Sequence, residues 1–273
     1  MDARAYIKQT GAHVKIVHIQ QYHFINLHLT DVCNLKCYGC NRYCDSAPSS
    51  DRMTIGQVRR FVNESIDTAW PWVELRLAGG EPCLHPEFEE ILSEISRLKR
   101  HLPNMVVKVL TISTTKRVND RLKMVPDDFL TPRSTPQKDK SRPVEVDGIE
   151  RDIIPEFGNV FLAPVDRIES IGPVISTCQI HGTCGIELTR YGYVPCGCGG
   201  PRIYGEDLFA RLLKDINQEW CDDALSVLCA LCGRNLNYNV TFSESADVSK
   251  FWREALAEYA ISKPDFPLYP EAK

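Results

Sequence analysis

The sequence predicts an α/β protein: a partial (β/α) barrel followed by a small cysteine-rich C-terminal domain. Two observations predict the barrel. Strand-like and helix-like apolar patterns alternate over residues 24–113, and the central part of the chain is then too irregular to supply eight strands. A third observation predicts the second domain, because seven of the 12 cysteines follow residue 177. We expect an N-terminal extension over residues 1–23, the barrel core over 24–175, and the cysteine-rich domain with a C-terminal helix over 176–273.

The elements of the barrel follow from the spacing of apolar residues. The expected strands are residues 24–30, 72–78 and 105–113, and the expected helices are residues 54–69 and 86–102. Strands that alternate with crossover helices in this way form a parallel sheet. Later patterns predict an exposed loop over residues 131–146, a strand over 160–165, and helices over 206–220 and 248–260.

Composition and charge narrow the class of protein. The net charge of -4 gives no reason to expect nucleic acid or an anionic membrane as a partner. No apolar stretch approaches the roughly 20 residues that cross a bilayer, and the N-terminus carries no apolar signal segment. We therefore expect a cytoplasmic protein. In a reducing compartment, clustered cysteines hold metal more often than they form disulfides.

Three cysteines after the first expected strand have the spacing of an iron–sulfur site. Cys33, Cys37 and Cys40 form the pattern C-x3-C-x2-C within one loop. Three thiolates can hold three corners of a [4Fe-4S] cluster and leave the fourth iron open for another ligand. A zinc knuckle that takes Cys44 as its fourth ligand is the structural alternative.

A glycine motif follows the second expected strand. Gly79 and Gly80 permit close backbone approach to a ligand. Glu81 adds a carboxylate that can receive an ammonium group, and Pro82 restricts the turn. Since the carboxyl ends of parallel strands meet at one edge, we expect this motif to lie beside the cysteine loop. A Gly-Gly pair after a strand that serves only as a turn is the plainer alternative.

These motifs resemble the radical SAM superfamily. The resemblance rests on the triad spacing, on Tyr38 and Gly39 before the last cysteine, and on the GGEP sequence at residues 79–82; the family usually has an aromatic residue where Gly39 stands. It implies a [4Fe-4S] cluster on the triad, with S-adenosylmethionine (SAM) chelated to the open iron. One electron then breaks the C–S bond of SAM, and the resulting 5′-deoxyadenosyl radical abstracts hydrogen from a substrate.

The resemblance also implies individual residues and a partner. The implied SAM-binding residues are Tyr38, Gly39, Gly79, Gly80, Glu81, Pro82, Ser113 and Thr114. In the family the GGE segment contacts the SAM amino group, and polar residues at the end of the third strand bind the ribose or the carboxylate. Ser113 and Thr114 could instead cap the next helix. An electron donor such as flavodoxin or ferredoxin is the implied partner.

The later cysteines resemble the auxiliary-cluster modules called twitch and SPASM domains. A short strand pair with a glycine turn, closed by a distant C-x2-C, can supply four thiolates. The expected ligands of this second [4Fe-4S] cluster are Cys184, Cys196, Cys229 and Cys232. Cys178 or Cys198 could replace one of them, and a structural zinc ribbon is the alternative.

Three reactions compete within this class. Oxidation of a small metabolite or a peptide ranks first, because a second cluster could accept the electron of the substrate radical. Epimerisation ranks second and needs a hydrogen donor, for which Cys198 and Cys178 are candidates. Group transfer from SAM ranks third. A non-enzymatic zinc-binding interaction protein is the hypothesis from another class.

The histidines receive no functional role from the sequence. His85 is expected only to begin a helix. Residues five apart alternate between the faces of a strand, so regularly spaced histidines do not converge on one metal. We expect no function for His13, His18, His23 and His28.

Overall fold

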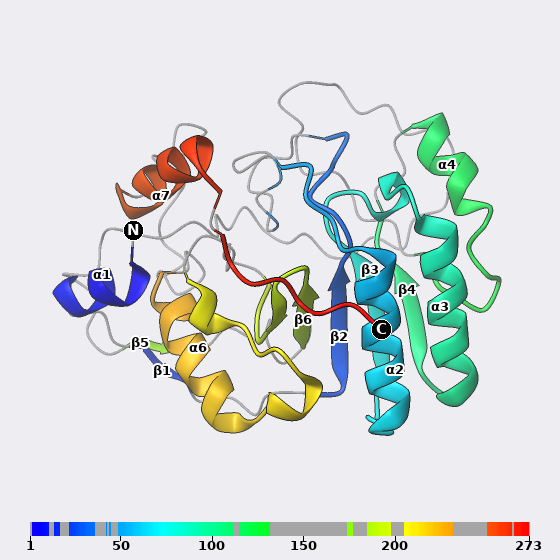
Figure 1. The fold of residues 1–273 in the computed structure, drawn as a ribbon, viewed down its shortest axis with the longest axis horizontal. Helices are drawn as coiled ribbons and strands as arrows, with labels where there is room; N and C mark the ends of the chain where they lie inside the picture. The colour runs from blue at the N-terminus through cyan, green and yellow to red at the C-terminus, as the bar shows by residue number, and fades with distance from the viewer. Residues whose placement is uncertain are drawn as a thin grey trace.

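The computed structural model describes residues 2–10, 14–16, 22–35, 42, 44, 49–111, 115–131, 174–176, 185–197, 205–231, 250–263 and 265–272. The helices in Figure 1 are α1 (Ala3–Thr10), α2 (Ile55–Asp67), α3 (Phe88–His101), α4 (Lys116–Leu122), α6 (Gln218–Ala230) and α7 (Lys250–Ile261). The strands are β1 (Val14–Ile16), β2 (Phe24–His28), β3 (Glu74–Ala78), β4 (Val106–Val109), β5 (Val174–Ser176), β6 (Ile186–Thr189) and β7 (Gly192–Val194). The 3-10 turns are η1 (Pro82–Leu84), η4 (Glu206–Leu208) and η5 (Leu213–Asp215).

A sheet of five strands organises the described part of the chain, in the order β4–β3–β2–β6–β7. The first four of these run parallel, and β7 returns antiparallel to β6. The expected strands at 24–30, 72–78 and 105–113 and the expected helices at 54–69 and 86–102 are confirmed, each a few residues shorter than the pattern predicted. The parallel sheet of an α/β fold is therefore present, with β1 and β5 as a separate parallel pair.

The β6–β7 hairpin joins the same sheet as β2. β6 and β7 belong by sequence to the expected cysteine-rich domain, yet β6 pairs with β2 and places Glu187 opposite Asn26. The expected boundary at residue 175 lies inside β5. How the chain divides into domains stays a prediction.

The two faces of the sheet differ in polarity. Leu27 and Leu77 are paired in register on one face with no exposed surface, and α2 and α3 cover that face (Figure 1). On the other face, Asn26 lies in register between Arg76 of β3 and Glu187 of β6. Parallel sheets covered by helices on both faces are apolar on both faces. The polar face is therefore the side of this sheet on which a polar ligand can be held.

The C-terminal segment connects the hairpin to α2, and in Figure 1 it crosses toward this helix and ends beside it. The backbone N–H of Tyr269 donates to the carbonyl of Arg190 at 2.8 Å. The hydroxyl of Tyr269 donates to Glu64 Oε2 at 2.8 Å, and the hydroxyl of Tyr193 donates to the same oxygen at 3.2 Å. These bonds fix the position of the β6–β7 hairpin relative to α2.

The expected helix over residues 206–220 is wrong. The chain instead forms the turns η4 and η5, and α6 begins only at Gln218. Between the two turns, Ala210 exchanges two backbone hydrogen bonds of 2.9 Å with Tyr193 of β7. This pairing requires extended backbone, so a tertiary contact outweighs the helical spacing of the apolar residues.

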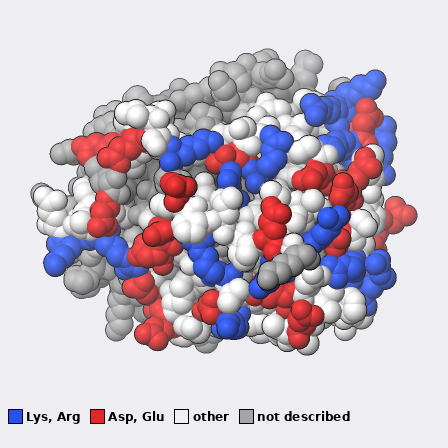
Figure 2. Space-filling view, in the orientation of Figure 1, with Lys and Arg blue, Asp and Glu red and all other residues white. Residues whose placement is uncertain are grey.

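The other expectations for the later part of the chain have mixed outcomes. The helix expected over residues 248–260 is confirmed as α7, with Tyr259 buried. The strand expected over 160–165 and all but the first residue of the loop at 131–146 lie outside the described residues. Acidic and basic side chains are interspersed over the face shown in Figure 2. In the part of the chain that the structure describes, no helix is long and apolar enough to span a membrane.

Candidate active site

The glycine motif is bonded to the backbone that leads into the cysteine loop. The N–H of Gly80 donates to the carbonyl of Thr30 at 2.6 Å, and the N–H of Glu81 donates to the carbonyl of Val32 at 2.9 Å. Cys33 follows directly. The two motifs that the sequence identified separately therefore form one unit at the carboxyl ends of β2 and β3.

Both glycines are required by this close approach. A Cβ on Gly79 would lie 2.5 Å from the carbonyl oxygen of Thr30, and one on Gly80 would lie 2.4 Å from that of Val32. Gly79 also has a φ of 136°, which side-chain-bearing residues rarely adopt. The sequence predicted close approach to a ligand, and the structure adds a close approach to the neighbouring backbone.

The carboxylate of Glu81 is held in one orientation. Glu81 is 3% exposed. One oxygen accepts from the N–H of Cys83 at 3.1 Å, and the other accepts from Thr111 Oγ1 at 2.8 Å. A buried carboxylate that is fixed by two donors is ready to receive a cationic group. The sequence identified Glu81 but assigned nothing to Thr111, because the contact joins the ends of two strands.

Several of the predicted residues lie outside the described part of the chain. Cys33 is described and half-buried, and Pro82 is buried in the first turn of η1. Thr115 accepts from the N–H of Val118 and so caps α4. The predicted site residues that lie outside the described ranges are Cys37, Tyr38, Gly39, Cys40, Ser113, Thr114, Cys178, Cys184, Cys198 and Cys232. Among the described residues alone, no three His, Cys, Asp or Glu side chains form a metal site.

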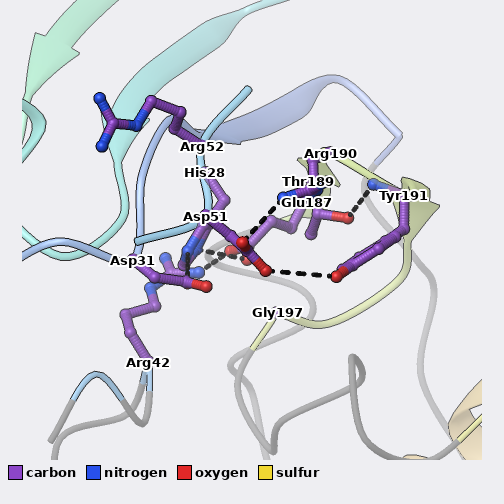
Figure 3. A pocket seen from close by; sticks show the side chains of 10 residues that line it. All are labelled: His28, Asp31, Arg42, Asp51, Arg52, Glu187, Thr189, Arg190, Tyr191 and Gly197. Atoms are coloured by element: carbon purple, nitrogen blue, oxygen red, sulfur yellow. Dashed lines mark hydrogen bonds and ion pairs between the residues drawn. The ribbon is translucent and has the colours of Figure 1, made fainter. Parts of the chain in front are cut away.

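A pocket opens at the carboxyl ends of β2 and β6. The described residues that line it are His28, Asp31, Arg42, Asp51, Arg52, Glu187, Thr189, Arg190, Tyr191 and Gly197. Figure 3 shows the side chains of His28 from β2, of Asp51 and of the β6–β7 hairpin close to one another, whereas that of Arg52 points away. The pocket is continuous with the polar face of the sheet, and Asp31 lies two residues before Cys33.

His28 stands between two carboxylates in this pocket. Its Nε2 lies 2.7 Å from Asp31 Oδ1, and its Nδ1 lies 3.3 Å from Glu187 Oε1. Arg42 also pairs with Glu187. Glu187 and Asp31 are 2% and 6% exposed, so these charges interact with little screening by water. The sequence predicted no role for His28, and only strand pairing brings Glu187 beside it.

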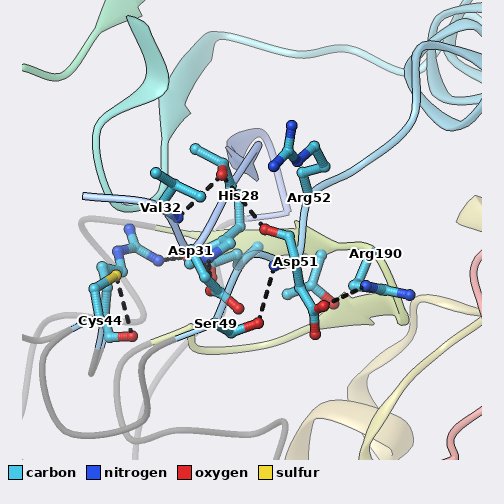
Figure 4. Close-up of polar contacts among 12 residues, drawn as sticks. His28, Asp31, Val32, Cys44, Ser49, Asp51, Arg52 and Arg190 are labelled. Carbon is cyan, nitrogen blue, oxygen red and sulfur yellow. Dashed lines mark hydrogen bonds and ion pairs between the residues drawn. The ribbon is translucent and has the colours of Figure 1, made fainter. Parts of the chain in front are cut away.

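A second charged group lies on the other side of the pocket (Figure 4). Asp51 Oδ1 is 2.9 Å from Arg190 Nη1 and 2.9 Å from Lys263 Nζ. The hydroxyl of Tyr191 donates to Asp51 Oδ2 at 3.5 Å, and burial raises the pKa of this phenol to about 12. The N–H of Asp31 donates to the carbonyl of Asp51 at 2.9 Å, which joins the two charged groups. No motif marks these residues in the sequence.

The residue that follows a predicted auxiliary ligand lines this pocket. Gly197 follows Cys196, and a Cβ on Gly197 would lie 2.0 Å from the carboxylate of Glu187. Cys196 is half-buried, and Cys229 is buried near the end of α6. Of the expected auxiliary ligands, Cys196 therefore lies beside the pocket, and Cys229 is buried in α6.

Three further cysteines that are not among the expected cluster ligands are buried. Cys83 and Cys221 have no exposed surface, and Cys44 is 8% exposed. Burial, with the nearby Glu81 carboxylate, raises the pKa of the Cys83 thiol well above its usual range, and burial raises that of Cys221 to about 12. Cys83 and Cys221 thus have the environment of small apolar core residues.

The backbone that leads into the cysteine loop, after the first strand of a parallel sheet, is bonded to a Gly-Gly-Glu segment after the second. Residues 27–132 match the model of the Radical SAM superfamily. This part of the chain is similar to radical SAM domains.

The relatives resemble this chain over part of their length. A GTP 3',8-cyclase from Actinobacillus succinogenes is 31% identical over 94 residues, which are 34% of this chain and 27% of the relative. Molybdenum cofactor biosynthesis protein 1 from Homo sapiens is 30% identical over 86 residues, which are 29% of this chain and 13% of the relative. A crystal structure of BtrN in complex with AdoMet and 2-DOIA is 12% identical with a TM-score of 0.51, covering 85% of this chain and 98% of that chain. The last similarity supports the fold.

Proposed function

We propose that this protein reductively cleaves S-adenosylmethionine and uses the 5′-deoxyadenosyl radical to abstract hydrogen from a small metabolite or a peptide, with net oxidation of the substrate. One observation carries the proposal: the backbone of Gly80 and Glu81 is hydrogen-bonded to Thr30 and Val32, directly before Cys33. This contact brings the proposed SAM-binding segment against the proposed cluster loop.

The residues present suit these cofactors. The thiolates of Cys33, Cys37 and Cys40 would hold three irons of a [4Fe-4S] cluster. The buried carboxylate of Glu81, held by Cys83 and Thr111, would receive the ammonium group of SAM. When bound, the cluster supplies the electron that cleaves SAM. Tyr38, Gly39, Ser113 and Thr114 are proposed as further SAM contacts, and flavodoxin or ferredoxin as the electron donor.

Net oxidation is proposed from the position of Cys196 and Gly197. The pocket lined by His28 and Glu187 lies between the residues leading to Cys33 and the loop of Cys196, because Gly197 packs on the Glu187 carboxylate. A second cluster held by Cys184, Cys196, Cys229 and Cys232 would lie beside the same pocket. A substrate radical in that position could lose an electron to it, which gives an oxidised product.

The proposal is tested by iron content and SAM cleavage after anaerobic reconstitution. The wild-type protein is expected to hold about eight irons and to release 5′-deoxyadenosine under reductant. Cys37→Ala is expected to abolish 5′-deoxyadenosine and to keep about half the iron. Cys229→Ala is expected to lose the other half. Cys221→Ala, which removes a buried cysteine from the same helix as Cys229, is the matched control and should keep all the iron.

Two results would contradict the proposal. Cleavage of SAM by Cys37→Ala would exclude the triad as the catalytic cluster site. A colourless protein containing two zinc ions would exclude the enzyme hypothesis. Retention of all iron by Cys229→Ala would reject only the ligand set of the second cluster.

A further inference from the structure

The pocket at the ends of β2 and β6 is balanced in charge. The three carboxylates that line it, Asp31, Asp51 and Glu187, are matched by three cations, Arg42, Arg190 and Lys263. Arg52 is exposed, points away from these carboxylates in Figure 3 and donates to the carbonyl of Ser50. A site for a triphosphate needs a surplus of cations, since each phosphate is held by Arg or Lys. The described lining offers no such surplus.

The charges are also paired with one another. Glu187 contacts Arg42 and His28, Asp31 contacts His28, and Asp51 contacts Arg190. A strongly charged substrate would have to replace one of these pairs, which leaves the displaced partner buried without compensation. A substrate without net charge can enter with every pair intact.

Hydroxyl groups meet this requirement. A hydroxyl donates one hydrogen bond and accepts two, so it can bridge a carboxylate and a guanidinium. Carboxylates and guanidinium groups lie side by side in the pocket: Glu187 lies beside Arg42, and Asp51 lies beside Arg190 (Figure 3). Several hydroxyls on a compact carbon skeleton would satisfy such a lining at several points at once.

We infer that this pocket binds a neutral polyhydroxylated small molecule as the substrate, and that Glu187 determines this specificity. The inference rests on the proposed function and adds a substrate class to it. Glu187 accepts hydrogen bonds from substrate hydroxyls while its charge keeps the pocket neutral. Loss of that charge gives the pocket a net positive charge, which favours anions.

The test measures binding of defined probes to the reconstituted protein with SAM, by isothermal titration calorimetry. The neutral probes are the inositols and the common hexoses; the charged probes are GTP and L-lysine. At least one neutral probe is expected to bind at millimolar concentration. Glu187→Gln is expected to weaken that binding about tenfold and to strengthen GTP binding. Glu89→Gln, an equal change of charge on an exposed residue of α3, should alter neither.

Stronger binding of GTP or L-lysine than of every neutral probe overturns the inference, as does the absence of any neutral binder. An unchanged affinity in Glu187→Gln also overturns it. If Glu187→Gln does not fold, Arg190→Gln replaces it and is likewise expected to weaken neutral binding about tenfold. The release of 5′-deoxyadenosine is also measured without added substrate, to distinguish failure of this inference from failure of the proposed function. If the protein cleaves SAM but binds no neutral probe, only the substrate class is rejected. If the reconstituted protein with SAM releases no 5′-deoxyadenosine, the proposed function is rejected.

Discussion

Replacing Gly80 with alanine tests whether the glycine motif serves the contact with the cysteine loop. Gly80 has an ordinary φ, so the change adds a methyl group without the backbone strain that Gly79→Ala would bring. The new Cβ would lie 2.4 Å from the carbonyl oxygen of Val32 and 2.9 Å from that of Asp31. Both neighbours are backbone atoms, which cannot rotate away as the end of a side chain can.

The size of the effect follows from these distances. Carbon atoms pack best at about 3.5–4.0 Å from their neighbours, so the two segments must move about 1 Å apart. Overpacking of this kind costs about 1–3 kcal/mol. The movement also lengthens the 2.6 Å bond from Gly80 to Thr30 and the 2.9 Å bond from Glu81 to Val32. Each is worth about 1 kcal/mol, so we expect Gly80→Ala to lower the free energy of unfolding by about 2–4 kcal/mol.

The assay is urea unfolding followed by circular dichroism, together with SAM cleavage by the reconstituted protein. Gly56→Ala is the matched control. Its Cβ would lie 2.5 Å from Glu271 Oε2, which can turn away, and 3.1 Å from the Glu271 Cβ, which need move only a few tenths of an ångström. Alanine favours the helix by up to about 1 kcal/mol. Gly80→Ala should lose stability and SAM cleavage, whereas Gly56→Ala should change stability by less than about 1 kcal/mol. Equal stability and equal cleavage in both variants would refute the close contact.

Two further predictions concern buried groups. Burial raises the pKa of Tyr193 and of Tyr269 above 10.0, the usual value for tyrosine. Above pH 10 these phenols therefore lose their protons in the unfolded state before they do in the folded state. As a result, the free energy of unfolding falls by up to about 1.4 kcal/mol per pH unit for each tyrosine. Urea midpoints at pH 9–11 should therefore fall more steeply for the wild type than for Tyr193→Phe/Tyr269→Phe, and parallel curves would contradict this. The Cys83 thiol, with its raised pKa and no exposed surface, should react with iodoacetamide only after unfolding, as read by mass spectrometry. Labelling of Cys83 in the folded protein would show that its burial is wrong.

The spacing of apolar residues predicted the structure correctly where a helix depends on residues within its own segment. Apolar spacing located α2, and Thr54 and Gln57 form a capping box at its start. The same kind of pattern failed over residues 206–220, because backbone pairing between Ala210 and Tyr193 requires an extended segment there. Periodicity reports which side chains are apolar, and a partner strand can bury the same side chains in another conformation.

The charged pocket could not be predicted in the same way. His28 was expected to have no function, yet it lies between Asp31 and Glu187. Asp31 is three residues away in the chain, but Glu187 comes from β6, and only the pairing of β6 with β2 brings it to His28. No periodicity or spacing encodes the register of two strands so far apart in sequence.

The alternation of strands and helices, the cysteine triad and the Gly-Gly-Glu motif can be predicted from the sequence, because each depends on residues that are close together in the chain. The hydrogen bonds from the Gly80–Glu81 backbone to Thr30 and Val32 become visible only in the folded protein. The same is true of the β6–β7 hairpin, which completes the pocket beside β2. Hydrogen bonds and ion pairs act over a few ångströms, so their partners are set by which strands the fold places side by side.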